Sequence, residues 1–271
     1  MPKEAINQVA ANQGAANQGA VSHEGVSHEG VSQEVKVYKV WDKPTRLFHW
    51  INLGLVMVLI FIGMVMLFKG DIGISGLEAK IGLKKLHVWV GYLFAINLSI
   101  RLIWGVIGSH SARLSQFLPD LKGLSRYKAK LAKGESPQYL YHNPMGRLAI
   151  FAMMLLLVTI MVTGLVRAGT DIYYPPFGGA VSDYIAQPGV DGASIKPYDD
   201  TGVDAQKVAV LKTYKSLAGE VHVYSVYLLI LMIVLHVAGV IVAEIKHQPG
   251  LVSAMISGNK LLSGPAEDEK H

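Results

Sequence analysis

The chain contains no cysteine among its 271 residues, so disulfides, thiolate-bound metal clusters and covalent attachment of a c-type haem by the chain itself are excluded. Charged residues are also scarce, at 17% of the sequence against 51% hydrophobic residues. This imbalance is typical of membrane proteins. The net charge of +5 is concentrated in segments that flank apolar runs, which indicates cytoplasmic loops of a membrane protein rather than nucleic-acid binding.

Residues 1–35 have few large apolar side chains and repeat short polar units such as Val-Ser-His-Glu-Gly. Such a segment cannot bury enough surface to offset the entropy of ordering, so we expect a disordered tail. Its histidines, His23 and His28, are expected to be solvated rather than to bind metal. The segment shows no basic start followed by an apolar core, so we expect no secretory signal peptide.

Four apolar runs are each long enough to cross about 30 Å of hydrocarbon. They comprise residues 47–68, 86–108, 148–166 and 221–243. The sequence therefore predicts an all-α membrane protein in which residues 36–260 form one four-helix bundle, followed by a tail at 261–271. A short amphipathic surface helix is expected near 121–133. The polar segment 167–219 is rich in turn residues, and a connection of this length is usually functional or disordered.

The charges of the loops predict the orientation in the membrane. The loop between the second and third runs has the largest concentration of Lys and Arg, whereas segment 167–219 contains six aspartates and only four lysines. Because cytoplasmic loops are enriched in Lys and Arg, we place the basic loop and both termini in the cytoplasm, and segment 167–219 on the opposite, periplasmic side. Four lysines in the first loop oppose this orientation, but the reverse would export the more basic second loop.

Four histidines lie within the apolar runs. His222 and His236 share one run, and a separation of fourteen residues places them about 21 Å apart along a helix and within about 40° of each other around it. Ionisable side chains inside a membrane span are costly and are candidates for a functional site. In the predicted orientation His87 and His222 lie near the periplasmic surface, and His49 and His236 near the cytoplasmic surface. We therefore predict two pairs, His87 with His222 and His49 with His236.

Sites with two histidines suit some ligands better than others. Zinc requires four protein ligands, or three and a water molecule, and no nearby cysteine or carboxylate in these runs completes such a set. A b-type haem requires only two axial imidazoles on opposite faces of a flat ring. Glycines at positions 54, 91 and 239 would let this ring approach the helix backbones. The alternative is that each histidine is a lone polar side chain that forms a hydrogen bond between helices.

Other polar residues give weaker indications. Arg46 and Arg101 fall on the cytoplasmic side near His49 and His236, where they could bind a haem propionate or serve as interfacial arginines. His110, His142 and His247 are expected to be surface residues.

Several motifs in this order resemble those of a known family, the bacterial cytochrome b561 and nickel-iron hydrogenase cytochrome b subunit family. The resemblance covers roughly residues 38–260. The motifs are WDKPTRLFHW at 41–50, Leu86-His87 with Gly91-Tyr92, RLIWG at 101–105, HNPMG at 142–146, and LHVAGV at 235–240 with the ending at 247–260.

The resemblance implies a four-helix bundle in which His49, His87, His222 and His236 are the axial ligands of two b haems. It also implies electron transfer between a quinone in the bilayer and a redox partner outside it, such as a periplasmic cytochrome c or a dehydrogenase or hydrogenase subunit. We expect an electron-transfer subunit rather than a complete enzyme, with quinone reacting near the cytoplasmic surface and the tyrosine-rich segment 167–219 as the docking surface.

Three alternatives remain open at this point. The chain could be a membrane anchor without a redox role that holds a periplasmic enzyme. It could be a transporter whose histidines relay protons. It could also be a free-standing quinone oxidoreductase that acts on a small periplasmic reductant.

Overall fold

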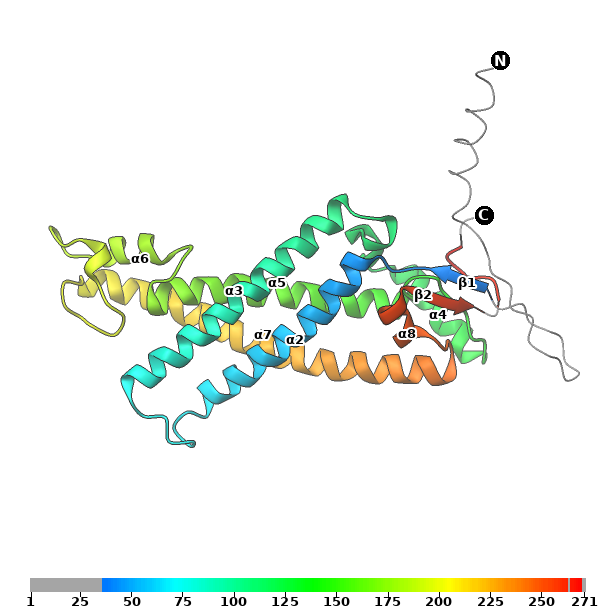
Figure 1. Ribbon diagram of the computed structural model, residues 1–271, viewed down its shortest axis with the longest axis horizontal. Coiled ribbons are helices and arrows are strands. Elements are labelled where there is room, and N and C mark those ends of the chain that lie inside the picture. Colours follow the sequence, from blue (N-terminus) through cyan, green and yellow to red (C-terminus); the bar gives the residue numbers. More distant parts are fainter. Residues whose placement is uncertain (1–35, 263, 270–271) are drawn as a thin grey trace, which may run out of the picture.

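The computed structural model describes residues 36–262 and 264–269 (Figure 1). The tail expected at residues 1–35 lies outside the described residues. Four helices are long and apolar enough to cross a membrane, and they confirm the predicted all-α, multi-pass membrane bundle. They are α2 (Lys43–Leu67), α3 (Leu77–Ile107), α5 (Pro144–Ile172) and α7 (Ala205–Lys246).

Side-chain caps fix where three of these helices begin. The Asp42 carboxylate accepts a hydrogen bond from the backbone N–H of Thr45 at 2.9 Å and starts α2. Asn143 caps α5 in the same way, with the N–H of Gly146 at 2.7 Å. Asp204 caps α7. Asp and Asn are favoured at this position because their oxygens satisfy backbone N–H groups that have no partner in the first turn.

The helices extend further than the apolar runs predicted. Helix α3 begins at Leu77 rather than 86, α5 ends at Ile172 rather than 166, and α7 begins at Ala205 rather than 221. The added turns carry charged residues, which end an apolar run but do not end a helix outside the bilayer. Segment 167–219 is accordingly mostly helical, since α6 (Gly178–Ile185) and a short 3-10 turn also lie within it.

The four long helices pack as two pairs. Helix α7 lies along α5, α2 and α3 form a hairpin across them, and α3 also contacts α5 (Figure 1). The centre of the bundle is an apolar cluster of Val56, Phe94, Leu98, Leu157, Ile160 and Leu229. Large apolar side chains elsewhere on the long helices face outward, among them Phe61 and Val106, as expected of a surface in contact with lipid.

The bundle has two dissimilar ends (Figure 1). At the strand end, β1 pairs with β2 in antiparallel register, with Lys36 opposite Leu262. Both ends of the described chain therefore lie on one side of the bundle. Helix α4 at this end confirms the short helix expected near 121–133. Helix α6 marks the opposite end, the α6 end. The elements of the strand end are β1 (Lys36–Lys39), α4 (Leu121–Ala132), α8 (Leu251–Ser257), β2 (Asn259–Leu262) and the 3-10 turns His110–Ala112 and Leu114–Phe117.

Candidate functional site

The structure brings His87 on α3 together with His222 on α7, as predicted. Their ring centroids are 6.3 Å apart and their planes are inclined at 77°. With a metal–nitrogen bond of about 2 Å and about 1.1 Å from each nitrogen to its ring centre, two imidazoles on one iron have centroids about 6 Å apart. The observed spacing therefore fits axial ligation of a single iron between the rings.

The ring of His222 is fixed by a neighbour on α5. Thr163 Oγ1 lies 3.0 Å from His222 Nδ1, and the same hydroxyl lies 2.7 Å from the carbonyl oxygen of Thr159. Because a hydroxyl has one proton, which Thr163 donates to that carbonyl, it accepts a hydrogen bond from His222 Nδ1–H. We assign the proton to Nδ1 on this basis, which leaves Nε2 free to bind a metal. The next residue, Gly164, lets the ring lie against α5, since a Cβ there would come within 3.2 Å of His222 Cε1.

His49 on α2 and His236 on α7 are the second predicted pair, and both lie in the half of the bundle nearer the strand end. His49 Nδ1 is buried without a hydrogen-bond partner. The central apolar cluster separates the two pairs, because Leu229 is seven residues from both His222 and His236. The four histidines therefore lie two in each half of the bundle.

The helices that carry His49 and His87 pack loosely against the helix that carries His222 and His236. In the part of the chain that the structure describes, neither α2 nor α3 packs its backbone closely on α7. A Cβ added at Gly54, Gly91 or Gly239 would meet no atom within 4 Å. Among residues 36–262 and 264–269, no group of three or more His, Cys, Asp or Glu residues could hold a metal ion. The residues present fit a bis-histidine haem better than a bare metal ion.

Arg101 is a buried cation at the strand end. Arg101 is 2% exposed, and its NH1 has no hydrogen-bond partner. Its guanidinium lies over the rings of Phe48 and Phe117. Arg46, nearby on α2, donates from NH1 to the carbonyl of Ile256, while its Nε is buried without a partner. Buried guanidinium N–H groups without an acceptor are costly, so this region suits an anionic group such as a haem carboxylate.

His142 was expected at the surface, but the structure places it in a partly buried position. Its ring packs on Trp41 and Phe117, with centroids 4.7 and 5.6 Å away, and its Nδ1 is buried without a partner. Burial, followed by the positive charge of Lys260, lowers the pKa of His142 to about 3. The imidazole is therefore neutral near pH 7. Of the other two, His110 is exposed, whereas His247 is partly buried and lies 3.4 Å from the hydroxyl of Ser136.

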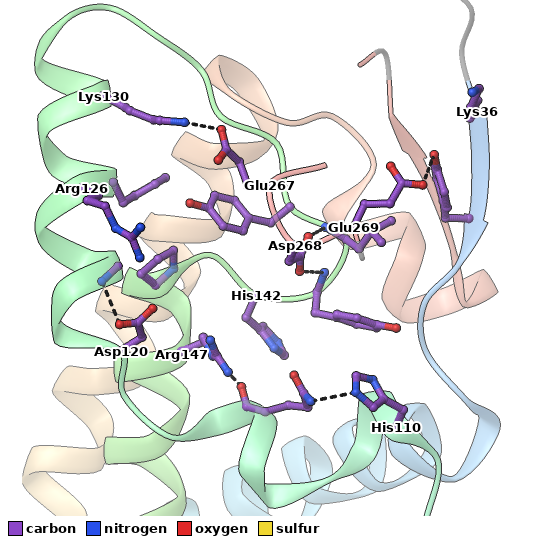
Figure 2. Close-up of a pocket in the computed structure, with 18 of the residues that line it drawn as sticks. Lys36, His110, Asp120, Arg126, Lys130, His142, Arg147, Glu267, Asp268 and Glu269 are labelled. Carbon is purple, nitrogen blue, oxygen red and sulfur yellow. Dashed lines mark hydrogen bonds and ion pairs between the residues drawn. The ribbon is translucent and has the colours of Figure 1, made fainter. Parts of the chain in front are cut away.

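His142 also lines a cavity of about 1150 Å³ at the strand end (Figure 2). The walls come from β1, α4, the start of α5 and the C-terminal segment, so residues far apart in the sequence meet there. Lys260, which is 2% exposed, donates to the carbonyls of Tyr139 and Leu140 and thereby holds the segment that leads to His142. Other lining residues are Tyr38, His110, Arg126, Tyr127, Arg147, Asp268 and Glu269.

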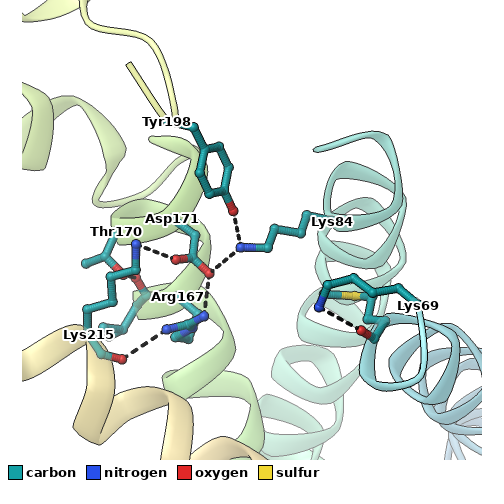
Figure 3. A network of polar contacts seen from close by, with 9 residues as sticks. Lys69, Lys84, Arg167, Thr170, Asp171, Tyr198 and Lys215 are labelled. Carbon is teal, nitrogen blue, oxygen red and sulfur yellow. Dashed lines mark hydrogen bonds and ion pairs between the residues drawn. The ribbon is translucent and has the colours of Figure 1, made fainter. Parts of the chain in front are cut away.

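Sequence reasoning missed an ionic cluster at the α6 end (Figure 3). Asp171 on α5 lies within 4 Å of three cations, namely Lys84 on α3, Arg167 on α5 and Lys215 on α7. All four residues lie just outside the apolar runs, where a charge normally marks the membrane boundary. A usable signal was their helical spacing from the histidines, since Lys84 precedes His87 by three residues and Lys215 precedes His222 by seven.

Comparison with known proteins gives a consistent family. The model of a family described as prokaryotic cytochrome b561 matches residues 40–258. Three curated relatives are each named a probable Ni/Fe-hydrogenase B-type cytochrome subunit. The relative from Cupriavidus necator is 28% identical over 151 residues, which are 51% of this chain and 61% of the relative. The relative from Bradyrhizobium diazoefficiens is 22% identical over 235 residues, which are 82% of this chain and 85% of the relative. The relative from Azotobacter vinelandii is 30% identical over 146 residues, which are 49% of this chain and 59% of the relative. The chain therefore spans only about three fifths of the length of the relatives from Cupriavidus necator and Azotobacter vinelandii.

Proposed function

Since the chain belongs to the prokaryotic cytochrome b561 family and is a membrane-bound b-type cytochrome of electron transfer, we propose that it holds two b haems and links the quinone pool to a periplasmic redox partner. His87 and His222 would be the axial ligands of one haem, and His49 and His236 those of the other. Arg46 and Arg101 would bind the carboxylates of the haem held by His49 and His236.

The proximity of His87 and His222 is the observation that carries this proposal. Their centroid separation of 6.3 Å suits two ligands of one iron, and α2 and α3 pack only loosely on α7. When bound, haem supplies one-electron redox chemistry. The chain supplies the imidazoles, the apolar layer around Leu229 that keeps water from between the two sites, and cations that neutralise acidic groups.

We propose that the strand end faces the cytoplasm of a bacterial inner membrane and the α6 end faces the periplasm. The loop between α3 and α5, which forms much of the strand end, carries six Lys and Arg residues against Asp120 and Glu135. This distribution supports the orientation because positive charge is retained in cytoplasmic loops. Quinone would then react near the strand end.

We also propose that the partner docks at the α6 end and is a hydrogenase, another dehydrogenase or a cytochrome c. The names of the relatives favour a hydrogenase. The connection between α5 and α7 offers a surface suited to a protein partner, because it combines exposed tyrosines with several aspartates. Tyr184 and Tyr198 are 48% and 51% exposed.

A reduced-minus-oxidised absorption spectrum of the purified full chain tests the proposal. We expect dithionite-reducible b-type bands, two haems per chain by pyridine haemochrome assay, and reduction of both haems by a soluble quinol in proteoliposomes. A protein without b-type bands would instead support a membrane anchor. Bands that a quinol cannot reduce would contradict the quinone link while leaving haem binding intact.

A further inference from the structure

The ionic cluster at the α6 end contains more positive than negative groups. Asp171 Oδ2 lies 2.5 Å from Arg167 NH2 and 3.3 Å from Lys84 Nζ, and its Oδ1 lies 2.7 Å from Lys215 Nζ (Figure 3). The Asp171 side chain is only 9% exposed, and the three cations are between 25% and 34% exposed. Three positive groups share one carboxylate, so two positive charges remain uncompensated in a partly buried setting.

Within a membrane protein this excess is costly. Partly buried charges lose some of their hydration, and like charges that converge on one point repel each other. Arg167 also forms a hydrogen bond to an uncharged group, because its NH1 donates to the backbone carbonyl of Lys215 at 3.1 Å. This bond does not neutralise its charge. Arginine and lysine gathered in this way are suited to bind carboxylates, which arginine can contact with two parallel hydrogen bonds.

The ionic cluster lies within one to two helical turns of the His87/His222 pair, on the side of the α6 end. Arg167 is one helical turn from Thr163, whose hydroxyl holds the ring of His222. The Arg167 guanidinium also packs against α7 at Gly219, where an added Cβ would come within 3.1 Å of NH1. Gly219 is one turn from His222, and Lys84 is one turn from His87. The cations therefore project from the same helices and faces that bring the two histidines together.

We propose that Lys84, Arg167 and Lys215 form the binding site for the two propionate carboxylates of the haem held by His87 and His222. This inference rests on the proposed function and completes it at the α6 end. Two ionised propionates would balance the two uncompensated positive charges. Asp171 acts as the fixed counter-ion that gathers cations from α3, α5 and α7 into one site, while Tyr198 holds Lys84 from the segment that leads to α7.

Redox titration of single-charge variants tests the site, in the His236→Ala background so that only the haem under study contributes. A nearby positive charge favours the reduced haem, which has one positive charge fewer than the oxidised form. Arg167→Gln and Lys215→Gln should therefore lower the midpoint potential, and Asp171→Asn should raise it. Lys212→Gln is the matched control, because Lys212 lies exposed on α7 one turn from Lys215 and should leave the potential unchanged.

The two directions test whether the charges of the cluster act on this haem. Opposite shifts for Lys215→Gln and Asp171→Asn support the site, whereas haem retained with no shift, or with shifts of the same sign, overturns it. If Arg167→Gln loses haem, the Lys215 and Lys84 variants decide the question. If the wild-type chain binds no haem, the proposed function itself fails, which is a distinct result.

The identity of the anion at this site needs a separate measurement, because a lipid phosphate could also bind to the three cations in place of the haem propionates. Redox-induced infrared difference spectra with haem labelled by ¹³C at the propionate carboxylates identify them directly. Labelled bands that shift in Lys215→Gln but not in Lys212→Gln support the proposal. Labelled bands that stay unchanged in Lys215→Gln, Lys84→Gln and Arg167→Gln overturn it and leave the site to another anion.

Discussion

His222 differs from His49 and His87 in the surroundings of its ring. Nδ1 of His222 has Thr163 Oγ1 as an acceptor, and the carbonyl of Ile160 lies within hydrogen-bonding reach of the same ring. Nδ1 of His49 and Nδ1 of His87 are buried without partners. A hydrogen bond from the distal nitrogen makes an imidazole a stronger electron donor to a bound metal, so the two faces of one haem would be held by unequal ligands.

Replacement of Thr163 by valine should raise the midpoint potential of the haem held by His222, on the order of tens of millivolts. The side chain keeps nearly the same shape, but the Nδ1–H group loses one acceptor, so the imidazole stabilises the oxidised haem less. Potentiometric titration of the visible spectrum measures this shift. Thr159→Val is the control, since that hydroxyl bonds only to the carbonyl of Leu155 on its own helix. A lowered or unchanged potential in Thr163→Val would count against the assigned role.

The sequence predicts the histidine pairs but not the residues that support them. Helix periodicity alone relates His222 to His236 and assigns a depth to His49 and His87. Thr163 carries no such signal, because threonine in a membrane helix commonly bonds to its own backbone, as Thr159 and Thr170 do here. Only the packing of α5 on α7 shows that this hydroxyl also meets a histidine.

At the scale of elements, α7 is the longest helix and belongs to both proposed sites. Its 42 residues span about 63 Å, roughly twice the hydrocarbon thickness. Hydropathy locates only its membrane-embedded part, because Lys207, Lys212 and Lys215 end the apolar run without ending the helix. The extra turns bring Lys215 to Asp171, so the sequence prediction stopped short of the ionic cluster.

Asp42, which caps the start of α2, also forms hydrogen bonds to the C-terminal end of α3. Oδ2 of Asp42 accepts hydrogen bonds from Trp104 Nε1 at 2.9 Å and from Ser109 Oγ at 2.6 Å, in addition to the bond from Thr45 N to Oδ1. Burial alone would raise the pKa of Asp42, but these hydrogen bonds outweigh it and lower the pKa. The carboxylate therefore stabilises two helices at once.

Asp42→Ala should destabilise the protein more than the loss of an ordinary cap. We expect about 2 kcal/mol, because the helix start loses its acceptor and the Trp104 and Ser109 donors lose theirs. Asp204→Ala removes the cap of α7, where the carboxylate serves only Gln206 and Lys207, and should cost about 1 kcal/mol. Thermal unfolding in one detergent compares the two variants. Equal losses would mean that the hydrogen bonds from Trp104 and Ser109 to Asp42 add no stability beyond the cap itself.

At the scale of the whole molecule, the two ends of the bundle are built differently. The strand end closes through long-range contacts, with β1 against β2 and Lys130 paired with Glu267 at 2.5 Å. The sequence indicated only a tail at 261–271, because no periodicity links residues so far apart in the chain. Membrane spans could be predicted because each is a local run, whereas the closure of the strand end and its cavity required the three-dimensional structure.

The central claim is that α7 contributes one ligand to each of two haems, and haem content per chain tests it most directly. Pyridine haemochrome assays and low-temperature spectra of His222→Ala and His236→Ala should each show one remaining haem of two, with a different spectral component lost in each variant. His110→Ala, which removes an exposed histidine, should keep both haems. Retention of two haems in either α7 variant, or loss of the same component in both, would contradict the pairing of His87 with His222 and of His49 with His236.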